Sequence, residues 1–160
     1  MLSIEGDWKM PKRGYMGWVE PPLRILLVED NYKDVEIIQR ALKGCSDKPD
    51  VYYARDGEEA LNFLQQRGEY EDVPRPDIII SCLNLPKING LEVLAMIKED
   101  PRLQRIPFIA LTYSEREEDI CRAYGAGASG FFTKPIDKVE FKEAVRTIHS
   151  YWNGAQKAPW

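Results

Sequence analysis

Histidine is the scarcest chemically useful residue in this chain, with His149 alone among 160 residues. That argues against a metal centre built on histidines and against a His-based catalytic triad. Long hydrophobic runs are also lacking. No apolar stretch approaches membrane-spanning length, and the N-terminus has no signal-peptide stretch. We therefore expect a protein with no membrane partner.

Cysteine and clustered basic charge are scarce as well. The cysteines are Cys45, Cys82 and Cys121, an odd number without the spacing of metal ligands, which predicts free thiols and a cytoplasmic location. The formal net charge is −4, and no long basic run is present. A nucleic-acid partner is therefore not expected.

What the sequence does contain is an alternation of strand and helix patterns, in a composition typical of one globular domain. Short apolar runs predict strands at residues 24–28, 51–54, 78–80, 108–111 and 131–133. Apolar residues at helical spacing follow each run. In the last helix these are Phe141, Ala144, Val145, Ile148 and Trp152.

Capping signals mark the last two helices. Ser114 and Glu117 are spaced as a capping box, and Gly125 is expected to end the helix that follows. Asp137 is expected to cap the final helix together with Glu140. The buried face of the fourth helix is predicted to carry Ile120, Ala123 and Tyr124.

Five βα units with nearly continuous apolar strands predict a parallel sheet covered on both faces. The expected fold is α/β, a doubly wound five-stranded parallel sheet of order 2-1-3-4-5 with five helices, of the flavodoxin-like type. In this topology a binding crevice lies at the carboxyl ends of strands 1 and 3.

Polar residues stand at four of those carboxyl ends. Glu29 and Asp30 follow strand 1, and Cys82, Thr112 and Lys134 end strands 3, 4 and 5. Neighbouring carboxylates beside a crevice call for a cation, and Mg²⁺ suits them. Carboxylates, a hydroxyl and an ammonium that meet at one point predict a phosphoryl-transfer pocket.

Each of these residues also has a purely structural interpretation. The acidic pair could begin a solvated first helical turn, Thr112 could cap its own loop, and Lys134 could lie in a surface turn. Cys82 could be an inert core thiol. Their joint position at consecutive strand ends favours the pocket.

Taken together, the motifs closely resemble response-regulator receiver domains over residues 23–152. This leaves an N-terminal extension, 1–22, and a C-terminal tail, 153–160. The matching motifs are Glu29-Asp30, Leu83-Asn84-Leu85-Pro86 with Gly90, Ala110-Leu111-Thr112, and the stretch from Gly125 to Lys134-Pro135. Residues 65–76 resemble the link found in receivers that partner phytochrome-like and archaeal sensor kinases.

The resemblance implies Mg²⁺ held by Glu29, Asp30, the backbone carbonyl of Asn84 and the residue at position 82. It implies Lys134 and Thr112 as phosphoryl contacts, Thr112 and Phe131 as the switch pair, and a cis Lys134-Pro135 peptide. A sensor histidine kinase and a downstream protein target are the implied partners. The implied activity is self-phosphorylation only, in a stand-alone regulator that is not otherwise an enzyme.

Cys82 departs from the family, which has the phosphoacceptor aspartate at this position. A thiol beside Glu29 and Asp30 should resist ionisation, and sulfur is a poor ligand for Mg²⁺. Phosphorylation should therefore be weak or absent. Two explanations stay open: an engineered replacement of aspartate, or a natural pseudo-receiver that acts as an interaction or thiol-based module.

Two rival classes share parts of this pattern. A flavodoxin-like electron carrier would need a phosphate-binding first loop, which Glu29 and Asp30 would repel. A haloacid-dehalogenase-type phosphatase would need an acid two residues after Asp30, where Tyr32 stands.

Aromatic residues outside the motifs suggest contacts with a partner or a second copy. Trp8, Tyr15 and Trp18 lie in the N-terminal extension, and Trp160 ends the tail. The stripe Phe141, Val145, Ile148 and Trp152 exceeds what a last helix must bury, so a homodimer through this helix is a further expectation.

Overall fold

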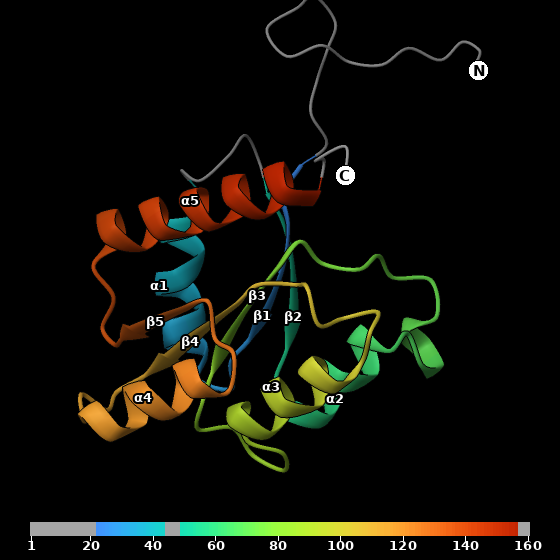
Figure 1. Ribbon diagram of the computed structural model, residues 1–160, viewed down its shortest axis with the longest axis horizontal. Coiled ribbons are helices and arrows are strands. Elements are labelled where there is room, and N and C mark those ends of the chain that lie inside the picture. The colour runs from blue at the N-terminus through green and yellow to red at the C-terminus, as the bar shows by residue number, and fades with distance from the viewer. Residues whose placement is uncertain (1–21, 44–48, 157–160) are drawn as a thin grey trace, which may run out of the picture.

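Five parallel strands form the single sheet that the sequence predicts (Figure 1). The computed structural model describes residues 22–43 and 49–156. The sheet order is β2-β1-β3-β4-β5, which confirms the expected doubly wound fold. The strands are β1 (Arg24–Val28), β2 (Asp50–Ala54), β3 (Ile78–Cys82), β4 (Phe108–Thr112) and β5 (Gly130–Thr133).

Helices cover both faces of this sheet (Figure 1). They are α1 (Tyr32–Leu42), α2 (Gly57–Leu64), α3 (Gly90–Glu99), α4 (Glu117–Gly125) and α5 (Lys138–Gln156), with a short 3₁₀ turn η1 (Gly68–Tyr70) in the link before β3. Helices α1 and α5 share one buried cluster with the sheet, and α2, α3 and α4 share the other. The strands are buried from both sides, which explains their continuous apolar runs.

Side chains of β1 and β4 alternate between the two clusters, as do Ile78, Ile79 and Ile80 of β3. In β1, Ile25 and Leu27 face α1 and α5, whereas Leu26 and Val28 face the other three helices. All five residues of β3 are buried. A strand enclosed in this way has a fixed register, because a slip of one residue would exchange its two faces. Cys82, at the end of β3, is therefore fixed in place by the core.

The structure corrects the predicted start of the fourth helix. Helix α4 begins after Arg116, which makes no side-chain cap bond, so Ser114 and Glu117 form no capping box. The backbone N–H of Ser114 donates to Thr112 Oγ1 at 3.2 Å, and its hydroxyl donates to Asp119 Oδ2 at 2.6 Å. Ser114 belongs to a turn that continues from β4, and this turn delays the helix.

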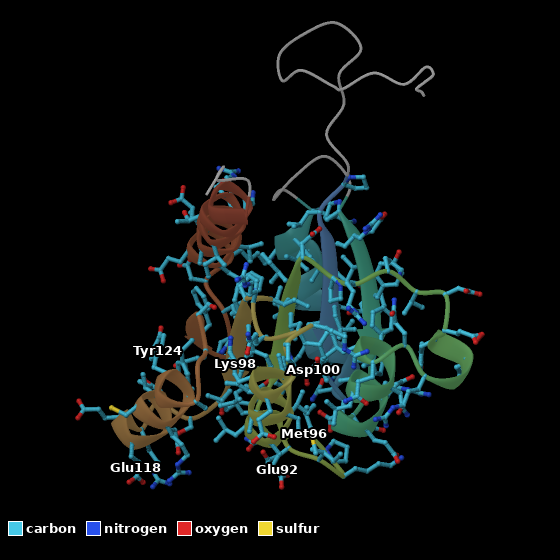
Figure 2. The ribbon with its side chains drawn as sticks, turned by 45° about the vertical axis from the view of Figure 1, so that its right-hand side comes forward. Glu92, Met96, Lys98, Asp100, Glu118 and Tyr124 are labelled. Atoms are coloured by element: carbon cyan, nitrogen blue, oxygen red, sulfur yellow. The ribbon has the colours of Figure 1, made fainter. Side chains whose placement is uncertain are left out.

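The predicted face of α4 is wrong in one residue. Ala123 is fully buried, but Tyr124 is 49% exposed and lies at the surface of α4 (Figure 2). Gly125 is the last helical residue, as expected, whereas the glycine with a positive φ of 108° is Gly127. That backbone conformation favours glycine.

Helix α5 begins as predicted, with Asp137 Oδ1 accepting from the backbone N–H of Glu140 at 3.0 Å. Phe141 and Val145 are fully buried, and Ile148 packs against the same cluster. The domain's own core therefore uses Phe141, Val145 and Ile148 of the stripe that suggested a dimer, and the dimer itself stays a prediction. The helix ends at Gln156.

Several expectations lie outside the described residues. These are the extension up to residue 21, Cys45, the side chain of Trp152, and the tail from residue 157. Within the described ranges, no helix has both the length and the apolar character needed to span a membrane.

Candidate functional site

The predicted site residues do meet at the carboxyl edge of the sheet. Glu29 follows β1, Cys82 and Thr112 end β3 and β4, and Lys134 follows β5. All four are buried, whereas Asp30 beside them is exposed. The sequence thus places one exposed and one buried carboxylate at the point where the strand order reverses.

Lys134 is the centre of the cluster. Its Nζ lies 2.6 Å from Glu29 Oε1, 3.0 Å from Asp34 Oδ2 and 3.5 Å from Cys82 Sγ. The side chains of Lys134 and Glu29 are 3% and 1% exposed. Buried charges need partners of this kind, because an unpaired charge in a protein interior is strongly unfavourable. The surface-turn interpretation of Lys134 is excluded.

Asp34, on α1, is a residue of this cluster that the sequence motifs did not include. It is buried, and its Oδ2 lies 3.0 Å from Lys134 Nζ. A signal was present in the sequence, because Asp34 is spaced with Ile38 and Leu42 on the buried face of α1. An acid on an apolar face predicts a buried partner of opposite charge.

Tyr113 is the second residue that was missed. Its hydroxyl lies 2.8 and 2.9 Å from the two carboxylate oxygens of Asp34, and its ring lies over Lys134 with Nζ 4.9 Å from the centroid. The distance is within the range of a cation–π contact. Tyr113 is 57% exposed, so it covers the cluster on the solvent side.

The predicted switch residues, Thr112 and Phe131, make contacts that loop capping and core packing explain. Thr112 Oγ1 accepts from the backbone N–H of Ser114 at 3.2 Å, which matches the loop-capping interpretation. Phe131 is half-buried against the cluster of α2, α3 and α4. A role for either residue in switching stays a prediction.

Local backbone geometry fixes Cys82 beside this cluster. Glycine is required at position 90, because a Cβ there would lie 2.5 Å from the carbonyl oxygen of Cys82. The close approach lets the loop after β3 fold back, with the N–H of Gly90 donating to the carbonyl of Leu83 at 2.9 Å. The Lys134-Pro135 peptide is cis, as the motif predicts.

The Cys82 thiol is held in its neutral form. Burial raises its pKa, the Glu29 carboxylate raises it further, and Lys134 opposes both effects. The sulfur lies 3.6 Å from the carbonyl oxygen of Asn84, to which the thiol donates. Since only the thiolate is a strong nucleophile, Cys82 is poorly suited to attack a phosphoryl donor.

Three of the four expected metal ligands lie close enough to share one ion, and the part of the Asn84 carbonyl stays a prediction. Ligand atoms of Glu29, Asp30 and Cys82 all lie within 4.8 Å of one another. The two carboxylates fit a hard divalent cation such as Mg²⁺, whereas the thiol does not, because sulfur is a soft ligand. The donor set therefore fits the ion through its oxygens only, and Glu29 is shared with Lys134.

Cys82 should react much more slowly with iodoacetamide at pH 7 than Cys121, the exposed cysteine on α4. We expect a difference of at least about tenfold, because Cys82 is both buried and held as a thiol with a raised pKa. The rate at Cys82 should keep rising at pH values above the ordinary pKa of a cysteine thiol, because the pKa of Cys82 is raised. Peptide mass spectrometry after timed alkylation measures both sites in one sample. Equal rates at pH 7 would contradict the neutral, enclosed thiol.

An acidic pair and a buried lysine at the switch point of a five-stranded parallel sheet are the arrangement that the receiver motifs predict. A family model for the response regulator receiver domain matches residues 25–146. The chain belongs to the response regulator receiver domain family.

Individual relatives agree with this assignment. Response regulator Rcp1 of Synechocystis is 43% identical over 132 residues, which cover 82% of this chain and 90% of Rcp1. The probable methanogenesis regulatory protein FilR2 of Methanothrix harundinacea is 36% identical, over 88% of this chain and 90% of its own length.

Solved structures show the same likeness. The phosphorylated cyanobacterial phytochrome response regulator RcpA has a TM-score of 0.73 and 40% identity, covering 88% of this chain and all of that one. The Mn²⁺-bound form of Rcp1 has a TM-score of 0.70 and 43% identity, covering 82% and 94%.

Proposed function

We propose that this chain is a two-component receiver that docks on a sensor histidine kinase and signals by protein–protein contact in the cytoplasm. The observation that carries the proposal is the Lys134 ammonium, which lies 2.6 Å from Glu29 and 3.5 Å from the residue at the acceptor position. Likeness to a phytochrome response regulator supports a phytochrome-type kinase as the partner. The proposed output face is α4, β5 and α5, where the two helices flank the edge strand in Figure 1.

Four residues of the chain have proposed roles in phosphoryl transfer. Glu29 and Asp30 would hold a divalent cation, which supplies positive charge against the phosphoryl oxygens when it is bound. Lys134 would pair with one phosphoryl oxygen, and the Thr112 hydroxyl would donate to another. No enzymatic turnover beyond self-phosphorylation is proposed.

Because a neutral thiol stands at position 82 in place of the family's aspartate, this arrangement lacks a nucleophile. This form should therefore not be phosphorylated. The test is phosphotransfer from acetyl phosphate with Mg²⁺. The chain as it stands should keep its mass, and the Cys82→Asp variant should gain one phosphoryl group. Labelling of neither form would contradict the proposed pocket.

The alternative is a natural pseudo-receiver that works without phosphorylation, as an interaction or thiol-based module. One observation favours it, because Lys134 is paired with the buried carboxylates of Glu29 and Asp34, so that side chains of the chain itself balance the charge of the site. Binding of the sensor kinase that is unaffected by Cys82→Asp and by donor would support this alternative.

Mg²⁺ and Mn²⁺ should bind the chain at the carboxylate pair. Affinity should be at least about tenfold weaker than in Cys82→Asp, because a thiol replaces one hard oxygen ligand. Titration followed by Tyr and Trp fluorescence measures both proteins. Glu29→Gln with Asp30→Asn should abolish binding, whereas Glu36→Gln with Glu143→Gln, which removes two exposed acids, should not. Saturable binding that survives the first pair of changes would exclude this site.

A further inference from the structure

Lys134 has no hydrogen-bond donor left for a phosphoryl group. An ammonium carries three donors, and Glu29 Oε1, Asp34 Oδ2 and Cys82 Sγ take one each. An incoming phosphoryl oxygen can bind Lys134 only if one of these contacts is given up. The question is which of the three is released.

Burial and bonding distinguish the three contacts. Glu29 makes the shortest bond, its side chain is 1% exposed, and its second oxygen accepts from the N–H of Asn31 at 3.1 Å. Position 82 is where an acceptor would carry the phosphoryl group itself. Asp34 is 10% exposed, its bond to Lys134 is longer, and it keeps the Tyr113 hydroxyl as a donor when Lys134 leaves. Asp34 is therefore the contact that is released most readily.

We propose that Asp34 is a positioning residue that holds Lys134 in the resting pocket and competes with a phosphoryl oxygen for it. Tyr113 assists this exchange, because its hydroxyl donates to the Asp34 carboxylate and stabilises it once Lys134 has left. The inference rests on the proposed function, since it concerns the same phosphoryl-transfer pocket.

Tyr113 also connects the exchange to the surface. It follows Thr112 directly, at the start of the loop between β4 and α4, and its ring lies over Lys134. Movement of the ammonium away from Asp34 changes the contacts of this ring. The state of Lys134 is thereby coupled to the loop that leads into α4.

The test uses acetyl phosphate and Mg²⁺ with the full chain carrying Cys82→Asp. Adding Asp34→Asn should lower the KM for acetyl phosphate by about three- to tenfold, the scale of the net contribution of one ordinary hydrogen bond. The maximum labelling rate should stay within about twofold, because asparagine keeps the shape of the side chain and an acceptor for Tyr113. Asp34→Glu, which keeps the charge, should restore a KM near that of the parent.

Tyr113→Phe gives the opposite prediction. It keeps the ring but removes the hydroxyl that stabilises the released carboxylate, so the KM should rise by about two- to threefold. A purely structural role would shift the KM in the same direction in both variants. Glu36→Gln removes an equal charge from the exposed side of α1 and should leave the KM within about twofold.

Each outcome has a distinct meaning. Labelling of the Cys82→Asp parent with an unchanged or raised KM in Asp34→Asn overturns this inference and leaves the proposed function intact. Failure of the parent to be labelled overturns both.

The contact between Asp34 and Tyr113 is tested in the unaltered chain by NMR of ¹³C-tyrosine. The Tyr113 ring signal is assigned by its loss in Tyr113→Phe, and it should shift in Asp34→Asn. An unchanged signal overturns the proposed contact.

Discussion

Replacing Cys82 by aspartate should turn a chain that acetyl phosphate leaves unmodified into one that carries a phosphoryl group. The cysteine form lacks a nucleophile at neutral pH, because burial and the Glu29 charge raise the pKa of the thiol. An aspartate is ionised at that pH and offers an oxygen at the same place. Lys134, 3.5 Å from the present sulfur, is positioned to neutralise it.

Intact-mass spectrometry with and without donor measures this change. Cys82→Asn is the matched control, since it is close to aspartate in shape but cannot form an acyl phosphate. Omitting Mg²⁺ should abolish labelling of the aspartate form, because the phosphoryl oxygens then lack the cation that offsets their charge. Labelling of the asparagine control would place the acceptor elsewhere. Rapid labelling of the cysteine form would show that the thiol ionises in the pocket.

The fold could be predicted from the sequence because every strand pattern is followed by a helix pattern, as a parallel βα fold requires. Apolar runs such as 78–80 are continuous, and helical spacing follows every one. Parallel strands bring their carboxyl ends to one edge, so Glu29, Cys82 and Lys134 were predicted to meet, and they do. The predicted start of α4 was wrong, since the Ser114 hydroxyl accepts from the backbone N–H of Arg116, two residues on, and not from that of Glu117 as a capping box requires.

Asp34 and Tyr113 were missed for a different reason. Both belong to the site through side-chain contacts between segments far apart in the chain, and neither stands in a motif. Asp34 shares a helix face with Ile38, but which charge it meets depends on how α1 packs against the loop after β5. Tyr113 depends on the direction of a loop side chain, which spacing does not determine.

Removing the Lys134 charge should destabilise the domain by about 3–5 kcal/mol at pH 7, the usual consequence of breaking a buried ion pair. Lys134→Met keeps an unbranched apolar side chain, one atom shorter than lysine, but leaves Glu29 and Asp34 without their ammonium. Urea unfolding of parent and variant gives the difference in free energy of unfolding.

The loss of unfolding free energy in Lys134→Met should depend on pH, and the pKa of Glu29 determines the direction. Burial raises the pKa of this carboxyl above its ordinary value of 4.5, while Lys134 acts to lower it, so the variant should have a still higher pKa. A carboxyl with a raised pKa binds its proton more tightly in the folded state than in the unfolded state. Stability then falls as pH rises from the ordinary pKa through the raised one. The difference in free energy of unfolding between the parent and Lys134→Met should therefore be small near pH 4.5 and largest at pH 7 and above.

Two further measurements separate this electrostatic effect from loss of packing. Glu29→Gln in the Lys134→Met background should recover part of the stability at pH 7, because one unpaired charge is removed. Adding Mg²⁺ should recover part of it as well, provided that Glu29 and Asp30 bind the ion. A deficit that is equal at pH 4.5 and pH 7 and unaffected by Glu29→Gln would mean that the loss comes from altered packing at position 134 and not from the lost charge.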